Sequence, residues 1–367
     1  MPQLNLLTIL PIRAHAAIRG CWTIGLLLLL TTAFSTVTLA AVVAQNETDD
    51  ETISALLKIG VEQQLQGDFD RSNEIAAQLQ AKFPMNAIGH SFAMNTLVTQ
   101  LSWDTSDTQY DEALEREAKT TLKLCRRQID AEPESAAGYH SCGQAHFALT
   151  FLYAARGSYY RAGRNSSQTI TQLEAALARD ASLADAKMHL GATYYYADNL
   201  PPFVKAISRF LWFIPTGNSD KALPYMREAA EEGQYLSDAA KFIFADLVMS
   251  SEPTLIDEAG LYLIDLVTRY PSNRRFQLKY MQFLAQTKQH KKLLAVTTEY
   301  MTPEPQKQCC LPDPVDANLA RMWRVQAHLA LQDRTAAQTE FARVDSTNFP
   351  EWGQEWHRTT AQQLATP

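Results

Sequence analysis

The feature that most constrains the fold of this chain is a succession of helical apolar stripes separated by short turns. The first stripe consists of apolar residues that recur at helical spacing, namely Ile53, Leu56, Leu57, Val61 and Leu65. Gly67 and Asp68 interrupt it, and a second stripe ends at Pro84. Because alternating runs rich in Val, Ile and Thr are missing, the pattern predicts an all-α protein without a sheet.

The stripes come in pairs, and this pairing predicts stacked helical hairpins. A hairpin of two such helices cannot bury both apolar faces by itself, so successive hairpins must pack on one another. Proline cannot continue a helix, and it marks the ends of several stripes, at Pro84, Pro133, Pro271 and Pro350. The last expected helices cover residues 315–331, 334–344 and 351–364, the final one as a polar terminal cap.

Small residues within these helices resemble the tetratricopeptide repeat family. Gly60 and Pro84 have the separation that the family uses, and Leu190-Gly191 followed by Tyr194 matches its helix core. Looser matches occur at Gly143, Ala245 and Ala327. A small residue there lets the two helices of a hairpin approach closely. The resemblance covers most of residues 51–345. It implies an α-solenoid, a right-handed superhelix of antiparallel helical hairpins, which binds partners on its concave face.

The N-terminal segment predicts export. Arg13 and Arg19 precede an apolar run over residues 21–44, and acidic residues follow. This order is typical of a signal peptide, here residues 1–44. The alternative is an uncleaved membrane anchor through residues 21–44, because about 20 apolar residues can span a bilayer. In both cases we expect the domain at 46–367 outside the cytoplasm, in a bacterial periplasm.

Composition and motifs exclude several functional classes. The formal charge of −7 argues against nucleic-acid binding, which requires a basic face. A nucleophile elbow, a Gly-rich phosphate loop, an H-E-x-x-H zinc motif and a dinucleotide fingerprint are all missing from the sequence. We therefore expect a non-enzymatic protein without a cofactor.

Export changes the meaning of the cysteines. Setting aside Cys21 of the signal segment leaves four, at Cys125, Cys142, Cys309 and Cys310. Cys125 and Cys142 flank Pro133 at similar distances, so helices that fold back around this turn bring the two thiols together. The alternatives are a disulfide there or two buried thiols. Cys309 and Cys310 form a strained bond to each other, remain free, or pair with another chain.

His140, Cys142 and His146 raise the question of a metal site. On a helix, positions 142 and 146 share a face and position 140 points elsewhere. Two ligands are too few for zinc. The spacing therefore favours a packed pair in the core and no metal.

Arg156, Arg161 and Arg164, with Tyr159 and Tyr160, form a basic and aromatic segment that we place in a turn between two hairpins. Guanidinium groups bind carboxylates and phosphates through paired hydrogen bonds, so this segment is a candidate binding site. The alternative is a solvated loop.

Aromatic residues supply the other candidates. Tyr194, Tyr195 and Tyr196 are consecutive and cannot all be buried on one helix face, so one or two are expected to line a groove. An aromatic insertion around residues 200–223 contains Phe203 and Trp212, with Ser219 or Asp220 as the expected cap of the next helix. The insertion either contacts a membrane or a partner, or fills the core.

Together these observations predict an exported, TPR-like scaffold that binds a protein or peptide on its concave face. The alternative is a carrier associated with envelope transport, which would hold a small apolar ligand. A closed apolar cavity near residues 194–213 would favour the carrier, whereas an open face with polar and Tyr side chains would favour the scaffold. Convergent carboxylates or histidines with perturbed pKa values would instead indicate an enzyme.

Overall fold

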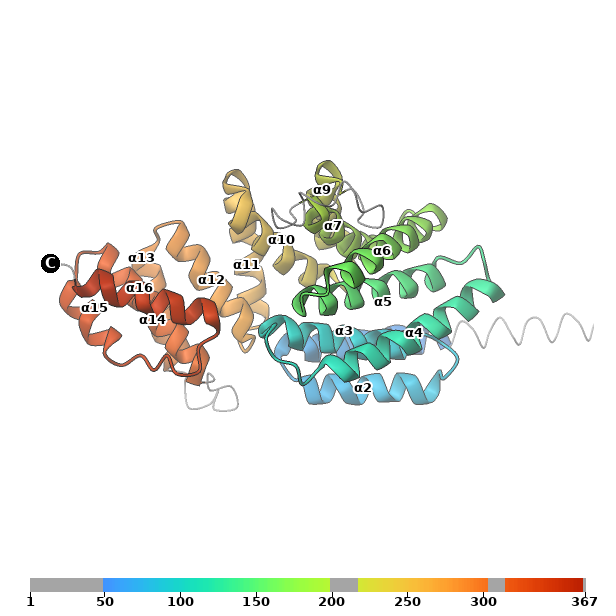
Figure 1. Cartoon of the computed structure of the whole chain (residues 1–367), viewed down its shortest axis with the longest axis horizontal. Helices are drawn as coiled ribbons and strands as arrows, with labels where there is room; N and C mark the ends of the chain where they lie inside the picture. The colour runs from blue at the N-terminus through green and yellow to red at the C-terminus, as the bar shows by residue number, and fades with distance from the viewer. Residues whose placement is uncertain (1–48, 199–216, 303–313, 366–367) are drawn as a thin grey trace, which may run out of the picture. The chain divides into compact units, whose positions relative to one another are not determined.

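The computed structural model describes residues 49–198, 217–302 and 314–365. The chain divides into two compact units, residues 1–55 and 56–367, and the arrangement below is that of the second. The described residues form helices and no strand (Figure 1), so the predicted all-α class is confirmed. The expected signal peptide at 1–44 and most of the expected aromatic insertion lie outside the described residues.

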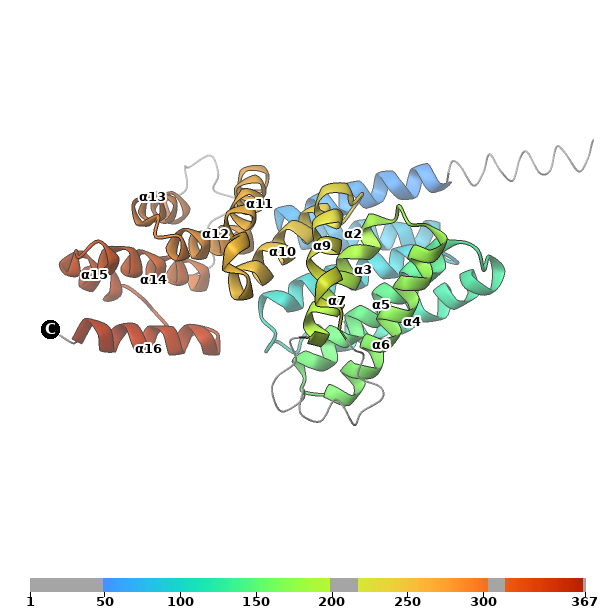
Figure 2. The ribbon, with the colours of Figure 1, turned by 90° about the horizontal axis from the view of Figure 1, so that it is seen from above.

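The helices pack in consecutive pairs along the chain. The first helix ends at residue 66. It is followed by α2 (Phe69–Lys82), α3 (Ile88–Trp103), α4 (Asp111–Ala131), α5 (Ala136–Ala155), α6 (Tyr159–Arg179), α7 (Ala184–Asp198), α9 (Ser219–Glu232), α10 (Ser237–Ser251), the 3-10 turn η1 (Pro253–Leu255), α11 (Ile256–Arg269), α12 (Arg274–Gln286), α13 (His290–Met301), α14 (Pro314–Ala330), α15 (Arg334–Phe341) and α16 (Glu351–Ala365). Figures 1 and 2 show α5 beside α6 and α7 beside α9, and the two helices of each pair are in extensive contact.

Local chemistry fixes the helix ends. Gly67 adopts a φ of 87°, a left-handed conformation that glycine adopts without strain, and the Asp68 side chain then accepts a hydrogen bond from the Arg71 amide at 3.0 Å to cap α2. At α9 the predicted cap is wrong. Asn218 caps this helix by accepting from the Lys221 amide, because it lies one position before the helix begins at 219.

Glycine permits two of the closest helix contacts. A Cβ atom at position 191 would lie 2.7 Å from the Ala222 carbonyl oxygen, and one at position 143 would lie 2.4 Å from Leu173 Cδ2. The carbonyl belongs to the backbone of α9 and cannot move aside cheaply. The small positions Ala245 and Ala327 are fully buried as well. The close helix contacts at Gly143 and Gly191 are therefore as the sequence predicts.

Successive hairpins contact each other through their first helices. α3 contacts α5, α5 contacts α7, α7 contacts α10, α10 contacts α12, and α12 contacts α14. We call these helices the row of first helices. The second helices of the hairpins pack against the row, and polar side chains that the row leaves uncovered are candidates for binding.

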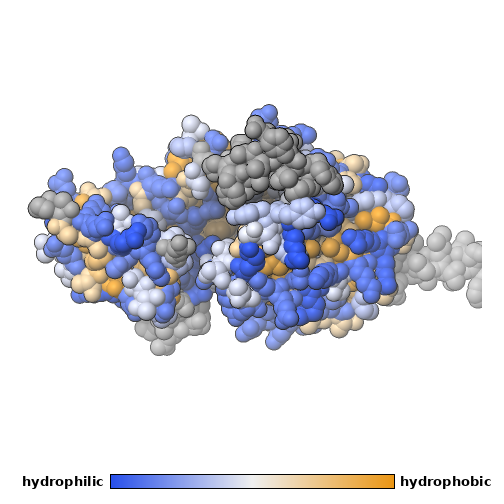
Figure 3. Space-filling view, viewed as in Figure 1, coloured by the Kyte–Doolittle hydropathy of each residue, from blue (hydrophilic) through white to orange (hydrophobic). Residues whose placement is uncertain are grey.

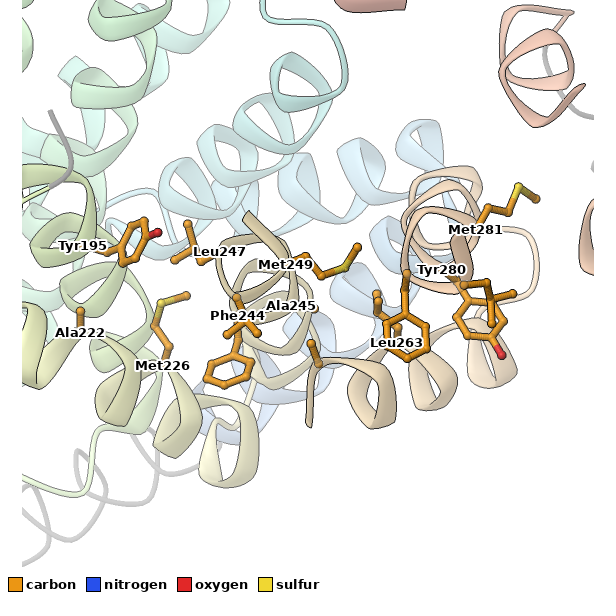
Figure 4. Close-up of a cluster of buried hydrophobic side chains, with 14 of the residues drawn as sticks. Tyr195, Ala222, Met226, Phe244, Ala245, Leu247, Met249, Leu263, Tyr280 and Met281 are labelled. Atoms are coloured by element: carbon orange, nitrogen blue, oxygen red, sulfur yellow. The ribbon is translucent and has the colours of Figure 1, made fainter. Parts of the chain in front are cut away.

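A continuous apolar cluster joins the middle hairpins. In Figure 4 its side chains follow one another from Tyr195 of α7, past Met226 of α9 and Phe244 of α10, to Met281 of α12. Tyr195 retains 9% of its surface and the other three are fully buried. Because this cluster spans several hairpins, α7 and α12 are held in one folded unit.

The first hairpin also contacts the turn between α11 and α12, far along the chain. Ser272 Oγ donates to the Gln66 carbonyl at 2.9 Å, and Asn273 Nδ2 donates to the Leu65 carbonyl at 2.8 Å. The Leu65 side chain packs in a cluster with Leu266, Tyr270 and Phe276. We call these contacts the clasp. An open repeat array has contacts between neighbouring repeats only, so the clasp is an addition to the expected architecture.

Asn273 serves both the clasp and the start of α12, since its Oδ1 accepts from the Phe276 amide at 3.1 Å. We expect Asn273→Ala to lower the free energy of unfolding by about 2–4 kcal/mol, through loss of the cap and of a buried hydrogen bond. Asn273→Ser keeps a side-chain oxygen that accepts from the Phe276 amide and loses the donor to Leu65, without placing a carboxylate beside the Leu65 carbonyl. Denaturant unfolding should therefore place Asn273→Ser between Asn273→Ala and wild type, and equal stability of all three would contradict the role of the clasp.

Candidate functional site

The three consecutive tyrosines have different surroundings. Tyr194 is buried and its hydroxyl donates to Glu174. Tyr195 belongs to the apolar cluster, and its ring meets that of Tyr196 edge-on at 5.8 Å. Tyr196 is 51% exposed. Of the three candidates, Tyr196 alone offers its ring at the surface.

Tyr196 lies near charged groups on the next first helices. Burial, followed by the nearby charge of Asp246, raises the pKa of Tyr196 to about 12, so its hydroxyl keeps its proton at neutral pH. Asp246 on α10 receives a hydrogen bond from Lys279 Nζ on α12 at 2.5 Å. Tyr196, Asp246 and Lys279 therefore lie near one another on the row of first helices, and we call these three residues the polar strip.

The basic segment is not a turn between hairpins, and this expectation is corrected. Arg156 lies in the turn that joins α5 to α6, and Arg161 and Arg164 lie within α6. The Arg156 guanidinium bonds both carboxylate oxygens of Asp111, at 2.6 and 2.7 Å, and the Asp107 carbonyl. Arg156 is thus occupied in joining α5 to the α3–α4 loop.

The other two arginines of this group are exposed. Arg161 lies over the Tyr153 ring at 5.1 Å, and Arg164 lies one turn further along α6. Tyr159 and Tyr160 are 44% and 57% exposed. These side chains are accessible to a partner, but Arg156 is not available to complete a three-arginine site.

Cys125 and Cys142 are joined by a disulfide, with their Cα atoms 5.5 Å apart, so the predicted pairing of α4 with α5 is confirmed. His146 Nδ1 lies 2.9 Å from Asn165 Oδ1. No cluster of three metal-ligating side chains occurs in the described ranges. The candidates Phe203, Trp212, Cys309 and Cys310 lie outside those ranges.

A cavity of about 830 Å³ lies where the end of α3 approaches α12 and α16. Sequence reasoning missed it, because three segments far apart in the chain form it. Its walls combine basic, acidic, hydroxyl and aromatic side chains. They are Ser102, Trp103, Asp104, Thr105 and Ser106, then Arg275, and then Pro350, Trp352, Gln354, Glu355 and Arg358.

Arg275 of α12 is the most constrained group in this wall. Its Nη2 donates to the Ser102 carbonyl at 2.6 Å and its Nη1 to the Trp103 carbonyl at 3.2 Å. Its Nε is buried and has no hydrogen-bond partner within the part of the chain that the structure describes. Burial lowers the pKa of Arg275, and this effect outweighs nearby carboxylates that raise it. The guanidinium group thus carries a charge that its surroundings solvate poorly.

The aromatic residues of the cavity are anchored differently. Trp103 packs edge-on against Phe69 at 5.1 Å, and the Arg274 guanidinium lies over its ring at 5.0 Å. Trp352 stacks on Trp356 at 6.4 Å and is 56% exposed. One indole is therefore fixed in the wall, and the other stands at the surface of α16.

Two histidines lie on α5 and α7 of the same row, His140 partly buried and His189 buried. The buried atoms His140 Nε2 and His189 Nδ1 have no hydrogen-bond partner among the described residues. Burial lowers the pKa of His140 to about 4, and burial together with the neighbouring His140 lowers that of His189 to about 3. Phe147 covers the His189 ring edge-on at 4.8 Å. Both imidazoles are therefore neutral near pH 7.

The visible face carries mainly hydrophilic residues, with hydrophobic residues in small groups among them (Figure 3). Within the described residues, none of the helices combines the length and apolarity that a membrane span needs.

No protein-family model matches this chain, and comparison with curated proteins gave no match. Function is therefore inferred from the geometry of the cavity and of the row of first helices.

Proposed function

We propose that this chain is a non-enzymatic binding protein of the cell envelope, a right-handed TPR-like superhelix that holds a protein or peptide partner on its concave face. In this proposal the row of first helices lines the concave face. The observation that carries the proposal is the cavity beside Arg275, which lies four positions before Lys279 on α12, and Lys279 in turn bonds Asp246 of α10.

The composition of the cavity favours a peptide over a purely apolar ligand. Its volume of about 830 Å³ falls within the range of about 300–1,000 Å³ that is typical of ligand sites. The walls carry hydroxyl, amide and charged groups beside two indole rings, which suits the alternating polar backbone and side chains of a peptide. A small apolar molecule, as in the carrier alternative, would leave these polar groups without partners.

Export to a bacterial periplasm is part of the proposal. It rests on the order of charges and apolar residues in 1–44 and on the Cys125–Cys142 disulfide, since such bonds persist in oxidising compartments. An uncleaved anchor through residues 21–44 would keep the same domain at the membrane surface.

Co-purification from the envelope fraction, followed by native mass spectrometry, tests the proposal. We expect a stoichiometric protein or peptide partner with the wild-type chain and its loss with the double variant Trp352→Ala, Arg358→Glu. Arg343→Glu is the matched control. Arg343 and Arg358 are 65% and 69% exposed, and each pairs with a Glu three positions earlier, but Arg343 lies outside the cavity.

Two outcomes would contradict the proposal. A co-purified small molecule without any protein or peptide would favour the carrier. Equal loss of the partner in the Arg343→Glu control would show that charge on this part of the surface, and not the cavity, determines binding.

A further inference from the structure

We propose that the cavity recognises a carboxylate, and that Arg275 binds it. This inference rests on the proposed binding function and names the chemical group that the cavity selects. The shared chemistry is a monovalent carboxylate next to an apolar or aromatic group, as found at the C-terminus of a peptide and in small aromatic acids.

The first argument is that Arg275 lacks a contact counter-ion. Three carboxylates are near enough to affect its pKa, those of Asp104, Asp246 and Asp316. Each has another partner. Asp104 accepts from the Ser106 amide and hydroxyl, Asp246 from Lys279, and Asp316 lies 3.2 Å from Arg274. Among the described residues, no carboxylate forms an ion pair with Arg275.

The second argument concerns the donors that Arg275 has left. The two backbone carbonyls of Ser102 and Trp103 fix its guanidinium group but do not neutralise it. A guanidinium group has more N–H donors than these two bonds use. A carboxylate in the cavity would supply the negative charge and accept such donors, and charge-assisted bonds of this kind are stronger than neutral ones.

The third argument is that the charge of the walls suits one negative charge better than two. Arg275 and Arg358 are opposed by Asp104 and Glu355, so the lining has no net charge. A carboxylate can bind Arg275 without meeting a strongly negative surface. A phosphate dianion would meet the same two acidic groups with twice the charge and without a further cation.

The fourth argument concerns the group that accompanies the carboxylate. Trp103 is fixed in one wall by Phe69 and Arg274, and Trp352 stands half-exposed at the other. Flat aromatic surface on both sides of a charged site favours a ligand that carries an aromatic or apolar side chain beside its carboxylate.

Isothermal titration calorimetry on the processed protein, purified from the envelope, tests the inference. The probes are a tetrapeptide that ends in Phe, with a free C-terminus or as its amide, and phenylacetate with phenylacetamide. For each acid that binds, we expect an affinity about ten- to a hundredfold higher than that of its amide. Arg275→Gln should remove this preference, while Arg343→Gln should retain it.

The arms of the experiment separate this inference from the proposed function. A preference seen with both pairs or with the peptide pair supports both proposals. A preference for phenylacetate, with no binding of either peptide, supports the carboxylate and contradicts the peptide. Equal binding of the peptide acid and its amide contradicts the carboxylate and leaves the binding function standing. No binding of any probe up to millimolar concentration overturns the inference.

Arg275 also fixes the end of α3, so Arg275→Gln could lower stability. Arg275→Lys is therefore measured alongside it. The ammonium keeps the charge but cannot make paired hydrogen bonds, and we expect an intermediate preference for the acid. The comparison of acid with amide on the wild-type chain needs no variant, and it decides the inference even if both variants unfold.

Discussion

Replacing Cys125 and Cys142 together with Ala is expected to lower the free energy of unfolding by about 3 kcal/mol. The bond closes a loop with a sequence separation of 17 and joins α4 to α5 in the interior, where Cys125 is fully buried. Without it, the unfolded chain gains conformational freedom that the folded chain does not. Denaturant unfolding monitored by circular dichroism measures the difference.

Reductant provides the control for this prediction. Wild-type protein in reductant should unfold at a denaturant concentration near that of the double Ala variant, whose own midpoint should not change. In the denatured, unreduced protein, neither cysteine should react with an alkylating reagent. Alkylation of both, or a wild-type midpoint that reductant leaves unchanged, would contradict the disulfide.

Much of the fold could be predicted because it depends on local chemistry. Helical spacing of apolar residues and the stops at Pro84 and Pro133 placed the helices within a few residues of their observed bounds, whereas Pro350 precedes the start of α16 and does not end α15, which stops at Phe341. The small residue at Gly191 predicted a close helix contact, and the structure shows that a Cβ there would meet the α9 backbone. The symmetric placement of two cysteines about a turn predicted that the two thiols meet and left open whether they are bonded, and the structure shows the disulfide.

The candidate site was less predictable, because its parts come from distant segments. The Ser102 and Trp103 carbonyls meet Arg275 across more than half of the described chain, and periodicity carries no information about such contacts. For Arg156 the sequence instead predicted a binding role that the structure does not support. Its position in a basic segment suggested ligand binding, yet it pairs with Asp111, a residue that shares no local motif with it.

The clasp relates the fold to the site. Asn273 and Arg275 are two residues apart at the start of α12, and they bond the first hairpin and the end of α3 respectively. The contact that brings the first hairpin to α12 therefore lies beside the group that we propose binds carboxylate. We infer that loss of the clasp would loosen the cavity wall as well as lower stability.

Acidification is expected to destabilise the wild-type protein more than a variant with His140→Gln and His189→Gln. In the unfolded chain both imidazoles have a pKa of about 6.5. In the folded chain the values are about 4 and about 3. Below pH 6.5 the unfolded chain therefore binds protons that the folded chain does not, and stability falls as the pH falls toward 3. Each pKa unit corresponds to about 1.4 kcal/mol, so His140 alone accounts for a loss of up to about 3 kcal/mol in the free energy of unfolding.

The measurement is the free energy of unfolding at several pH values between 7 and 4, for wild type and the double variant. Glutamine does not titrate, so the variant should lose less stability over this interval, whatever its stability at pH 7. Carboxylates titrate in both proteins and cancel in the comparison. His357→Gln is the control, because this ring stacks on Phe341 at 4.6 Å and lies outside the histidine pair. Equal pH dependence of wild type and the double variant would show that the two imidazoles accept protons in the folded chain as readily as in the unfolded chain, and would contradict the prediction.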